Sequence, residues 1–158
     1  MDNLFFTNEH IMIRNMVREF ADSEITPVAQ ELDELGKFPR DLVDKMGELG
    51  LMGILIPEKY GGAGLDMVAF ATAIMELGRA DASVAITMTA HSSLGSLPIL
   101  MFGSEEQKNT YLPKLASGEM LGAFGLTEPD AGSDAGATKT KAVRDGDEYV
   151  VNGGKILK

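Results

Sequence analysis

The sequence contains no cysteine, which excludes disulfide bonds, cysteine nucleophiles and metal sites built from thiolates. It has only two histidines, His10 and His91, and neither has other ligand residues at a spacing typical of a zinc site. We therefore expect no resident metal ion. It also lacks an uninterrupted apolar run of about 18 residues, and so we expect no transmembrane helix.

Positive charge is scarce as well, since 14 Lys and Arg face 24 Asp and Glu, for a net charge of −10. This balance argues against sequence-independent binding of nucleic acid, which needs cations to neutralise phosphates. Backbone N–H groups and a helix N-terminus could still hold a phosphorylated small ligand. The N-terminal region has neither a basic stretch followed by an apolar one nor an excess of arginine, and so we expect no targeting peptide.

The first third of the sequence predicts helices. Thr7 is a candidate N-cap, and apolar residues recur at helical spacing from there to Leu35. Pro27 is expected to bend or split this helix, and Gly36 to end it. A second helix is predicted over residues 40–49, and its apolar face consists of Leu42, Val43, Met46 and Leu49.

Two non-helical segments follow. Residues 50–57 are apolar and contain glycine, which predicts a buried connector. Residues 58–64 are rich in glycine but lack the spacing and the terminal Gly-Lys-Ser/Thr of a phosphate-binding P-loop. The sequence therefore favours a loop joining two helices over a phosphate site.

Three more helices are predicted beyond these segments. Asp66 can cap a third helix, and a fourth is expected over residues 81–102 with a disturbance at Pro98. The predicted buried face of that fourth helix consists of Val84, Met88, Leu94, Leu97 and Leu100. Residues 104–107 have the pattern of a capping box, which predicts a helix over residues 105–116.

His91 follows Ala90 and precedes Ser92 in the fourth predicted helix. A His–Ser pair suggests nucleophilic catalysis, but adjacent residues on a helix do not face each other. The pattern favours a packed or pocket-lining histidine over a catalytic base.

The pattern changes at about Gly118, where strands are expected. Residues 120–127 predict a strand, and residues 138–144 and 148–151 predict a hairpin with a turn signal at Asp145-Gly146. The predicted fold class is therefore mainly α. A helical domain over residues 1–118 precedes the first strands of an incomplete β domain over residues 119–158.

The run from Gly125 to Ala137 combines three glycines with acidic residues, a proline and the hydroxyls of Thr127 and Ser133. The N–H groups of Gly132 and Gly136 are not obstructed by side chains, which suits recognition of a carbonyl, a ring nitrogen or a phosphate. The alternative is a tight, acid-rich turn that only caps a strand. Composition alone leaves both interpretations open.

The residues from Gly125 to Asp134 resemble the first signature of the flavin-dependent acyl-CoA dehydrogenases at each of its defined positions. Three further runs, at residues 56–65, 102–108 and 152–155, resemble other segments of that family. Their order and spacing agree with it from about residue 6 to residue 155. Within the family, residues 122–127 look nearest to the short-chain, butyryl-type members.

This resemblance implies a fold, an activity and partners. The fold would be an up-and-down N-terminal helical domain, a middle β domain and a C-terminal helical bundle, of which this chain holds the first and the start of the second. The activity would be oxidation of acyl-CoA thioesters to trans-2-enoyl-CoA in fatty acid β-oxidation, with FAD as cofactor. Electrons would pass to electron-transfer flavoprotein, and the parent enzyme would be a homotetramer in the bacterial cytoplasm or the mitochondrial matrix.

The resemblance also assigns site residues. Those expected to contact FAD are Phe124, Gly125, Leu126, Thr127, Glu128, Pro129, Asp130, Ala131, Gly132 and Ser133. Thr127 would hydrogen-bond the pyrimidine edge of the isoalloxazine ring, and Ser133 would also touch the CoA substrate. No catalytic residue is expected in this chain, because the family's glutamate base lies in the C-terminal domain.

The sequence departs from the family pattern after Lys155. The family continues with a variable residue, an aromatic residue, Ile and Thr, whereas Leu157 and Lys158 stand here at the aromatic and Ile positions. We therefore expect a fragment that is inactive alone and binds FAD weakly or not at all. Two alternatives are a non-catalytic helical interaction module, with Leu51 near an apolar hollow for the electron acceptor, and a fragment of an acyl-CoA oxidase.

Overall fold

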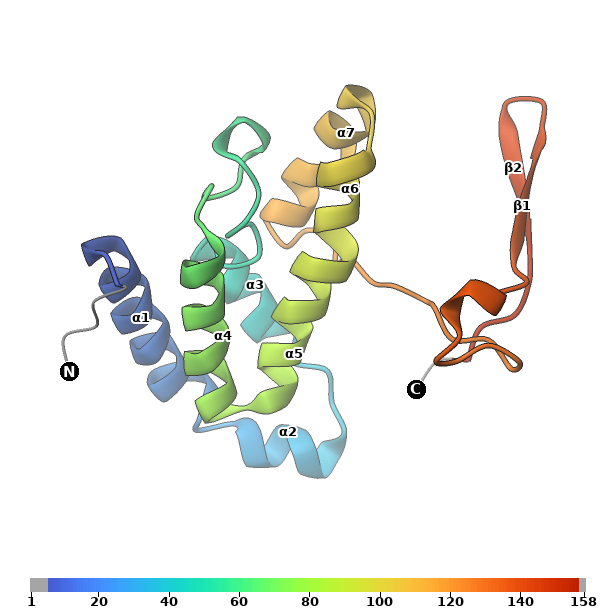
Figure 1. Cartoon of the computed structure of the whole chain (residues 1–158). Helices are drawn as coiled ribbons and strands as arrows, with labels where there is room; N and C mark the ends of the chain where they lie inside the picture. The colour runs from blue at the N-terminus through green and yellow to red at the C-terminus, as the bar shows by residue number, and fades with distance from the viewer. Residues whose placement is uncertain (1–5, 157–158) are drawn as a thin grey trace. The chain divides into compact units, whose positions relative to one another are not determined.

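Helices fill the first three quarters of the chain and a β-hairpin lies near its end, in a computed structural model that describes residues 6–156 (Figure 1). The chain divides into two units, one ending at Ala123 and one beginning at Phe124. The helical unit consists of α1 (Asn8–Phe20), η1 (Ala21–Ile25), α2 (Ala29–Leu35), α3 (Arg40–Glu48), η2 (Glu58–Tyr60), α4 (Met67–Ala80), α5 (Ala82–Ala90), η3 (His91–Ser96), α6 (Leu97–Phe102) and α7 (Glu105–Ala116). The second unit contains η4 (Ala135–Ala137), β1 (Lys141–Asp145) and β2 (Glu148–Asn152). The divergent positions Leu157 and Lys158 lie outside the described residues.

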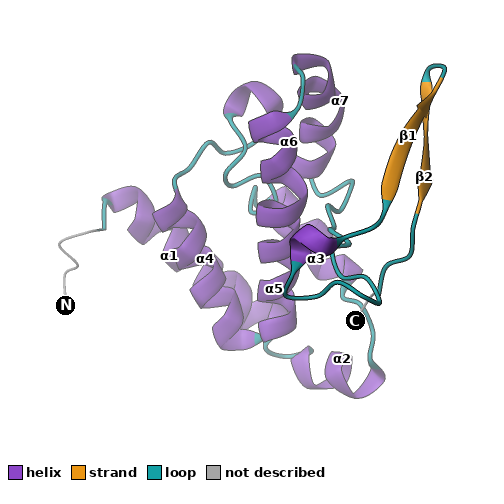
Figure 2. Ribbon diagram, turned by 45° about the vertical axis from the view of Figure 1, so that its right-hand side comes forward, coloured by secondary structure: helices purple, strands orange, loops and turns teal. Residues whose placement is uncertain are grey.

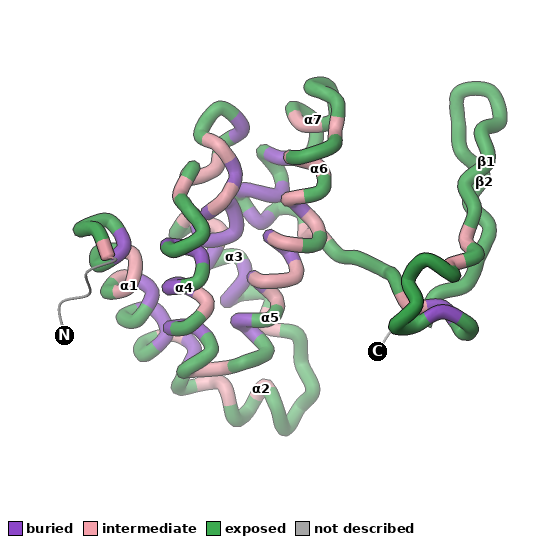
Figure 3. The backbone as a smooth tube through the Cα atoms, viewed as in Figure 1, coloured by how far each residue is buried: buried purple, intermediate pink, exposed green. Residues whose placement is uncertain are grey.

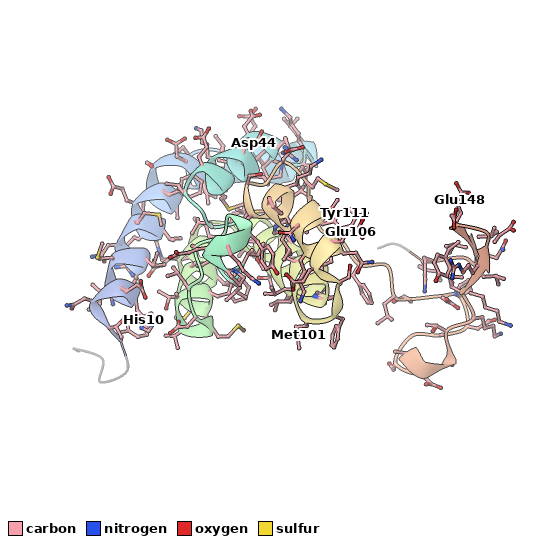
Figure 4. The ribbon with its side chains drawn as sticks, turned by 90° about the horizontal axis from the view of Figure 1, so that it is seen from above. His10, Asp44, Met101, Glu106, Tyr111 and Glu148 are labelled. Atoms are coloured by element: carbon pink, nitrogen blue, oxygen red, sulfur yellow. The ribbon has the colours of Figure 1, made fainter. Side chains whose placement is uncertain are left out.

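The N-termini of α1 and α4 are joined by a histidine, which lies at the start of α1 (Figure 4). Thr7 caps α1 as predicted, and the Thr7 N–H donates to Nδ1 of His10 at 3.1 Å. Nε2 of His10 therefore carries the proton and donates to the Asp66 carboxylate at 3.0 Å. Asp66 in turn accepts the Val68 and Ala69 N–H groups and caps α4, also as predicted.

The predicted break at Pro27 is confirmed. A π-helical turn, η1, follows α1, and α2 begins only at Ala29. Gly36 ends α2 with a left-handed φ of 57°, a conformation that glycine adopts at little cost. The helix predicted over residues 40–49 is also present as α3, although Leu49 is 40% exposed because it stands at the C-cap, beyond the buried face.

The core of the helical unit lies between α1, α3, α4 and α5 and the connector after α3, and buried positions line the inner sides of these elements (Figure 3). α1 packs along α4, and α4 packs against α5 (Figure 2). The largest fully buried core side chains are Ile25, Met46, Leu51, Met52, Ile54, Leu77 and Met88. Residues 50–57 thus include buried apolar side chains, as expected for the connector.

An ion cluster also links α1 to α4. Arg18 donates to both carboxylate oxygens of Glu76, at 2.9 and 2.6 Å, and Glu76 is only 7% exposed. The Arg18 hydrogen bond and charge, with Arg79 beside them, lower the pKa of Glu76. The buried carboxylate of Glu76 is therefore charged and paired with Arg18 across the two helices.

The fourth predicted helix is one continuous helical stretch, made of α5, η3 and α6. Its middle segment η3 is π-helical, with the Leu97 N–H donating to the carbonyl of Ser92 five residues earlier. The Ser96 hydroxyl also donates to the His91 carbonyl. This turn rotates the helix face, so that Leu94, predicted to be buried, is 47% exposed. Among the described residues the stretch Ala82–Phe102 is long and apolar enough to cross a membrane, and a single such helix is weak evidence for a membrane span.

The capping box at Ser104 and Gln107 and the following helix are confirmed as the start of α7. A second, smaller apolar cluster packs η2 against α7 through Tyr60, Leu112 and Leu115.

The strand predicted over residues 120–127 is wrong. Within the described residues this segment pairs with no other strand, and the Gly122 N–H donates to the side chain of His91 instead. A strand needs a partner to pair its backbone groups. The hairpin is confirmed, with β1 and β2 antiparallel and Val143 opposite Val150. Its turn lies at Gly146-Asp147, one residue later than predicted, with Gly146 at a φ of 62°.

Candidate functional site

The loop of residues 124–133 presents one set of side chains to its surroundings and folds another set inward. Phe124 is 56% and Leu126 41% exposed, although both are large and apolar. Glu128 and Ala131, by contrast, are only 5% and 2% exposed, and their backbone groups exchange two hydrogen bonds. The other predicted cofactor contacts, Gly125, Pro129, Asp130, Gly132 and Ser133, are exposed, and Thr127 is half-buried.

The carboxylate of Glu128 closes this loop onto the start of the hairpin. Oε2 accepts the Lys139 N–H at 2.6 Å, and Oε1 accepts the N–H and the hydroxyl of Thr140 at 3.0 and 2.5 Å. Nζ of Lys155 donates to the same Oε1 at 2.9 Å. The Thr140 hydroxyl, the Lys139 N–H and Lys155 together lower the pKa of Glu128 to about 2.

The other side of the loop is held by the segment after the hairpin. Lys155 also donates from Nζ to the Leu126 carbonyl at 3.0 Å, and the Ile156 N–H donates to the Thr127 carbonyl at 2.8 Å. The run at residues 152–155 thus lies against the loop at residues 125–134, so the structure brings together two of the motifs found in the sequence.

The loop groups that take no part in this closure are suited to binding a flavin. The hydroxyls of Thr127 and Ser133 take no part in the hydrogen bonds that close the loop. A Cβ added at Gly132 would meet no atom within 4 Å, and the φ of Gly132 is not positive. Free hydroxyls, an open backbone and the exposed apolar side chains of Phe124 and Leu126 suit a flat aromatic ring with a polar edge. The residues present therefore fit FAD.

The segment before the loop is anchored by His91, which is packed as predicted and 1% exposed. Its Nδ1 accepts the Gly122 N–H at 3.0 Å, and its Nε2 lies 3.2 Å from the Met52 carbonyl and 3.1 Å from the Leu115 carbonyl. Nε2 therefore carries the proton. This anchor was not predictable from the sequence, because all three partners are backbone groups distant along the chain.

Two glycines, Gly95 and Gly122, allow the segment before the loop to pack closely against η3. A Cβ on Gly95 would lie 2.5 Å from the Cα of Gly122, and a Cβ on Gly122 would lie 2.7 Å from the Cα of Gly95. Any side chain at either position would push the two backbones apart.

Other candidate sites have less support. Leu51, placed by the interaction-module hypothesis near an apolar hollow, is only 1% exposed and belongs to the core, so it offers no docking surface. Among residues 6–156, no three metal-ligating side chains cluster. A hollow of ≈ 310 Å³ lies between α2 and α3, and no residue of the loop lines it.

Comparisons with known sequences show the family of this chain. The family model described as "Acyl-CoA dehydrogenase, N-terminal domain" matches residues 7–119. The probable acyl-CoA dehydrogenase YngJ of Bacillus subtilis is 54% identical over 153 residues, which make up 97% of this chain and 40% of that protein. The short-chain-specific acyl-CoA dehydrogenase of Clostridium acetobutylicum is 49% identical, over 96% of this chain and 40% of that protein. This chain spans about two fifths of the length of these relatives.

Solved structures agree with the sequence comparisons. Butyryl-CoA dehydrogenase from Megasphaera elsdenii has a TM-score of 0.91 at 39% identity, covering 98% of this chain and 41% of that chain. Acyl-CoA dehydrogenase from Bacillus anthracis, complexed with FAD, has a TM-score of 0.88 at 46% identity, with 94% and 26% covered. A chain in the structure reported for the electron transferring flavoprotein of Acidaminococcus fermentans has a TM-score of 0.94 at 47% identity, with 98% and 40% covered. The fold is thus a helical N-terminal domain followed by the start of a β domain.

Proposed function

Because this chain belongs to the acyl-CoA dehydrogenase family, we propose that it supplies the N-terminal part of an FAD-dependent enzyme that oxidises short-chain acyl-CoA thioesters to trans-2-enoyl-CoA. In this proposal residues 1–118 are the helical domain and residues 119–158 begin the middle β domain. The loop of residues 124–133 forms one wall of the FAD site. The catalytic base lies in a part of the enzyme that this chain does not include.

The observation that carries this proposal is the loop itself, which is closed from within while Phe124, Leu126 and Ser133 remain exposed and Thr127 stays half-buried. The hairpin gives further support, since the apolar side chains of Val143, Tyr149 and Val151 are 60–66% exposed. A two-stranded hairpin is marginally stable alone, which fits a β domain that continues beyond these strands.

The residues have distinct roles in this proposal. The chemistry that FAD supplies when bound is acceptance of the β-hydrogen of the thioester as a hydride, while a base removes the α-proton. Thr127 donates a hydrogen bond to the pyrimidine edge of the ring, and the backbone near Leu126 adds further contacts. Ser133 contacts both the cofactor and the CoA substrate. These donors favour negative charge on that edge of the ring.

The relatives suggest the substrate and the partners. The similarity to short-chain-specific and butyryl-CoA dehydrogenases supports butyryl-CoA as the substrate class. The similarity to a chain in an electron transferring flavoprotein structure supports electron-transfer flavoprotein as the acceptor. We also propose a homotetrameric parent enzyme, located in the cytoplasm of a bacterium or in the mitochondrial matrix of a eukaryote.

A chimaera tests this function directly. Residues 1–155 are joined to the remaining part of the Bacillus subtilis relative, after the Asn-Gly-Gly-Lys run. We expect a yellow protein whose flavin absorbance bleaches when butyryl-CoA is added anaerobically. The unaltered relative is the control for folding and flavin content.

Two results would contradict the proposal. One is a chimaera with the circular dichroism spectrum of the relative but no retained flavin. The other is sustained butyryl-CoA-dependent dye reduction by the isolated 158-residue chain with added FAD, because that chain is proposed to lack the base.

A further inference from the structure

The Glu128 carboxylate faces the interior of the second unit, where its partners surround it. Its side chain is 6% exposed, and four donors from Lys139, Thr140 and Lys155 converge on its two oxygens. A carboxylate can accept about four hydrogen bonds. Most of its acceptor capacity is therefore used within this chain, with three donors at Oε1 and one at Oε2.

The groups that meet at Glu128 come from three separate segments. Glu128 belongs to the loop, Lys139 and Thr140 precede β1, and Lys155 follows β2. The N–H groups of residues 139 and 140 are consecutive along the backbone. The Glu128 carboxylate accepts both of them, as an anion does when it binds successive backbone N–H groups. The loop is thus fastened to both ends of the hairpin at one point.

A glycine after β2 shows how closely this point is packed. A Cβ on Gly153 would lie 2.1 Å from the Thr140 hydroxyl oxygen and 2.8 Å from the Thr140 Cα. The neighbouring Gly154 has open space, since a Cβ there would meet nothing within 4 Å. Only the first glycine is therefore needed to let Thr140 reach Glu128.

We infer that Glu128 is a positioning residue of the proposed FAD site, whose charged carboxylate gives the loop of residues 124–133 its shape before any cofactor binds. This inference rests on the proposed function where it names FAD as the ligand. The closure of the loop by Glu128 is argued from the geometry alone. It reassigns Glu128, which the signature placed among the cofactor contacts, to a role behind Thr127 and Leu126. Lys155 shares that role, since it also holds the Leu126 carbonyl.

The closure requires the ionised form of the residue. A protonated carboxyl would turn one acceptor into a donor facing N–H groups. Because the hydrogen bonds lower the pKa of Glu128 to about 2, the carboxylate remains charged well below the ordinary range of a glutamate. The charged groups around it are Lys155, which faces it directly, and Lys139, whose Nζ turns to Asp130 at 2.9 Å.

The test is hydrogen exchange and NMR on the full chain without FAD. Glu128→Gln keeps the size of the side chain and removes its charge. We expect the Lys139 and Thr140 amides to exchange at least tenfold faster and their proton signals to move upfield. Asp130→Asn, the matched control, removes a carboxylate of the same loop that is 72% exposed, and it should change those rates less than twofold.

Substitutions of Gly153, Gly154 and Lys155 provide tests that leave the Glu128 carboxylate in place. Gly153→Ala should reproduce the faster exchange, and Gly154→Ala should not. Lys155→Met should speed exchange, and Lys155→Arg should restore protection, which keeps the inference testable if Glu128→Gln unfolds the unit. Unchanged exchange in both Gly153→Ala and Lys155→Met would overturn the inference, as would an equal effect of Asp130→Asn.

A wild-type titration gives a further signature. The Glu128 carboxyl carbon signal should stay at its ionised position from pH 7 to pH 3, and a midpoint near the ordinary 4.5 would overturn the inference. Failure of the chimaera to bind FAD would contradict the proposed function and would leave these measurements untouched. The two failures are therefore distinguishable.

Discussion

Gly95→Ala is expected to lower the free energy of unfolding of the helical unit by about 3 kcal/mol. The added Cβ would lie 2.5 Å from the Cα and 2.8 Å from the carbonyl carbon of Gly122, and both are backbone atoms that no rotamer change can move. The Gly122 backbone must therefore shift, and this shift lengthens its hydrogen bond to His91. Urea unfolding followed by circular dichroism at 222 nm measures the loss.

Gly78 offers a matched control for the Gly95→Ala variant. It stands in α4, and a Cβ there would meet only the Cβ of Ala85, at an ordinary 3.6 Å. Gly78→Ala should stabilise the unit by about 0.5–1 kcal/mol, because alanine has the higher helix propensity. Equal stability of the Gly95 and Gly78 variants would contradict the close packing of Gly95 against Gly122.

His91→Leu is expected to cost a similar amount, about 3 kcal/mol, because it leaves the Gly122 N–H and the Met52 carbonyl without a partner and takes one of its donors from the Leu115 carbonyl. The leucine fills a comparable volume but cannot accept the Gly122 N–H or donate to the Met52 and Leu115 carbonyls. The same urea titration measures this loss.

Ser92 is the control for His91, since it is the next residue and is 3% exposed. Its hydroxyl oxygen is buried and has no hydrogen-bond partner among residues 6–156. Removing an unpaired buried polar group should be neutral or slightly stabilising. A Ser92→Ala variant as unstable as His91→Leu would show that the site is sensitive to any change, and not to the histidine's hydrogen bonds.

The burial of His91 also predicts a pH dependence with a definite sign. Burial lowers the pKa of His91, because a charged imidazolium loses hydration there. The unfolded chain, with a histidine pKa of about 6.5, therefore binds more protons below that pH than the folded chain does. The stability that His91 contributes is complete above about pH 6.5 and declines as the pH falls towards its folded pKa.

Comparison of wild type with His91→Leu isolates this contribution from that of other groups. The difference in unfolding free energy between the two proteins should be larger at pH 7.5 than at pH 5.5. A difference that is constant over this range, or that grows on acidification, would contradict the neutral state of His91 in the fold.

Features set by neighbouring residues were predictable from the sequence. The caps at Thr7, Asp66 and Ser104 each depend on a side chain and an N–H group within three residues. The helix end at Gly36 depends on one backbone conformation. Such signals lie within a few positions of each other, and so the starts of α1, α4 and α7 follow from local chemistry.

Features set by distant contacts were not predictable in the same way. Leu94 is a separate case, because its assignment to the buried face assumed an α-helical period and a local π-helical turn shifts that period. Residues 120–127 have the composition of a strand, yet a strand forms only where another strand pairs with it. The role of Glu128 depends on partners 11, 12 and 27 positions further along the chain. A family signature can place such a residue in a site without stating what it does there.

The proposed contact between the loop of residues 124–133 and FAD can be tested with Thr127→Val in the chimaera. Valine keeps the shape of threonine and removes the hydroxyl proposed to bond the flavin. We expect the dissociation constant for FAD to rise about tenfold, equivalent to about 1.4 kcal/mol, with unchanged thermal stability of the apoprotein. Thr110→Val on α7 should leave it unchanged. An FAD affinity equal to that of the unaltered chimaera would contradict the proposed contact.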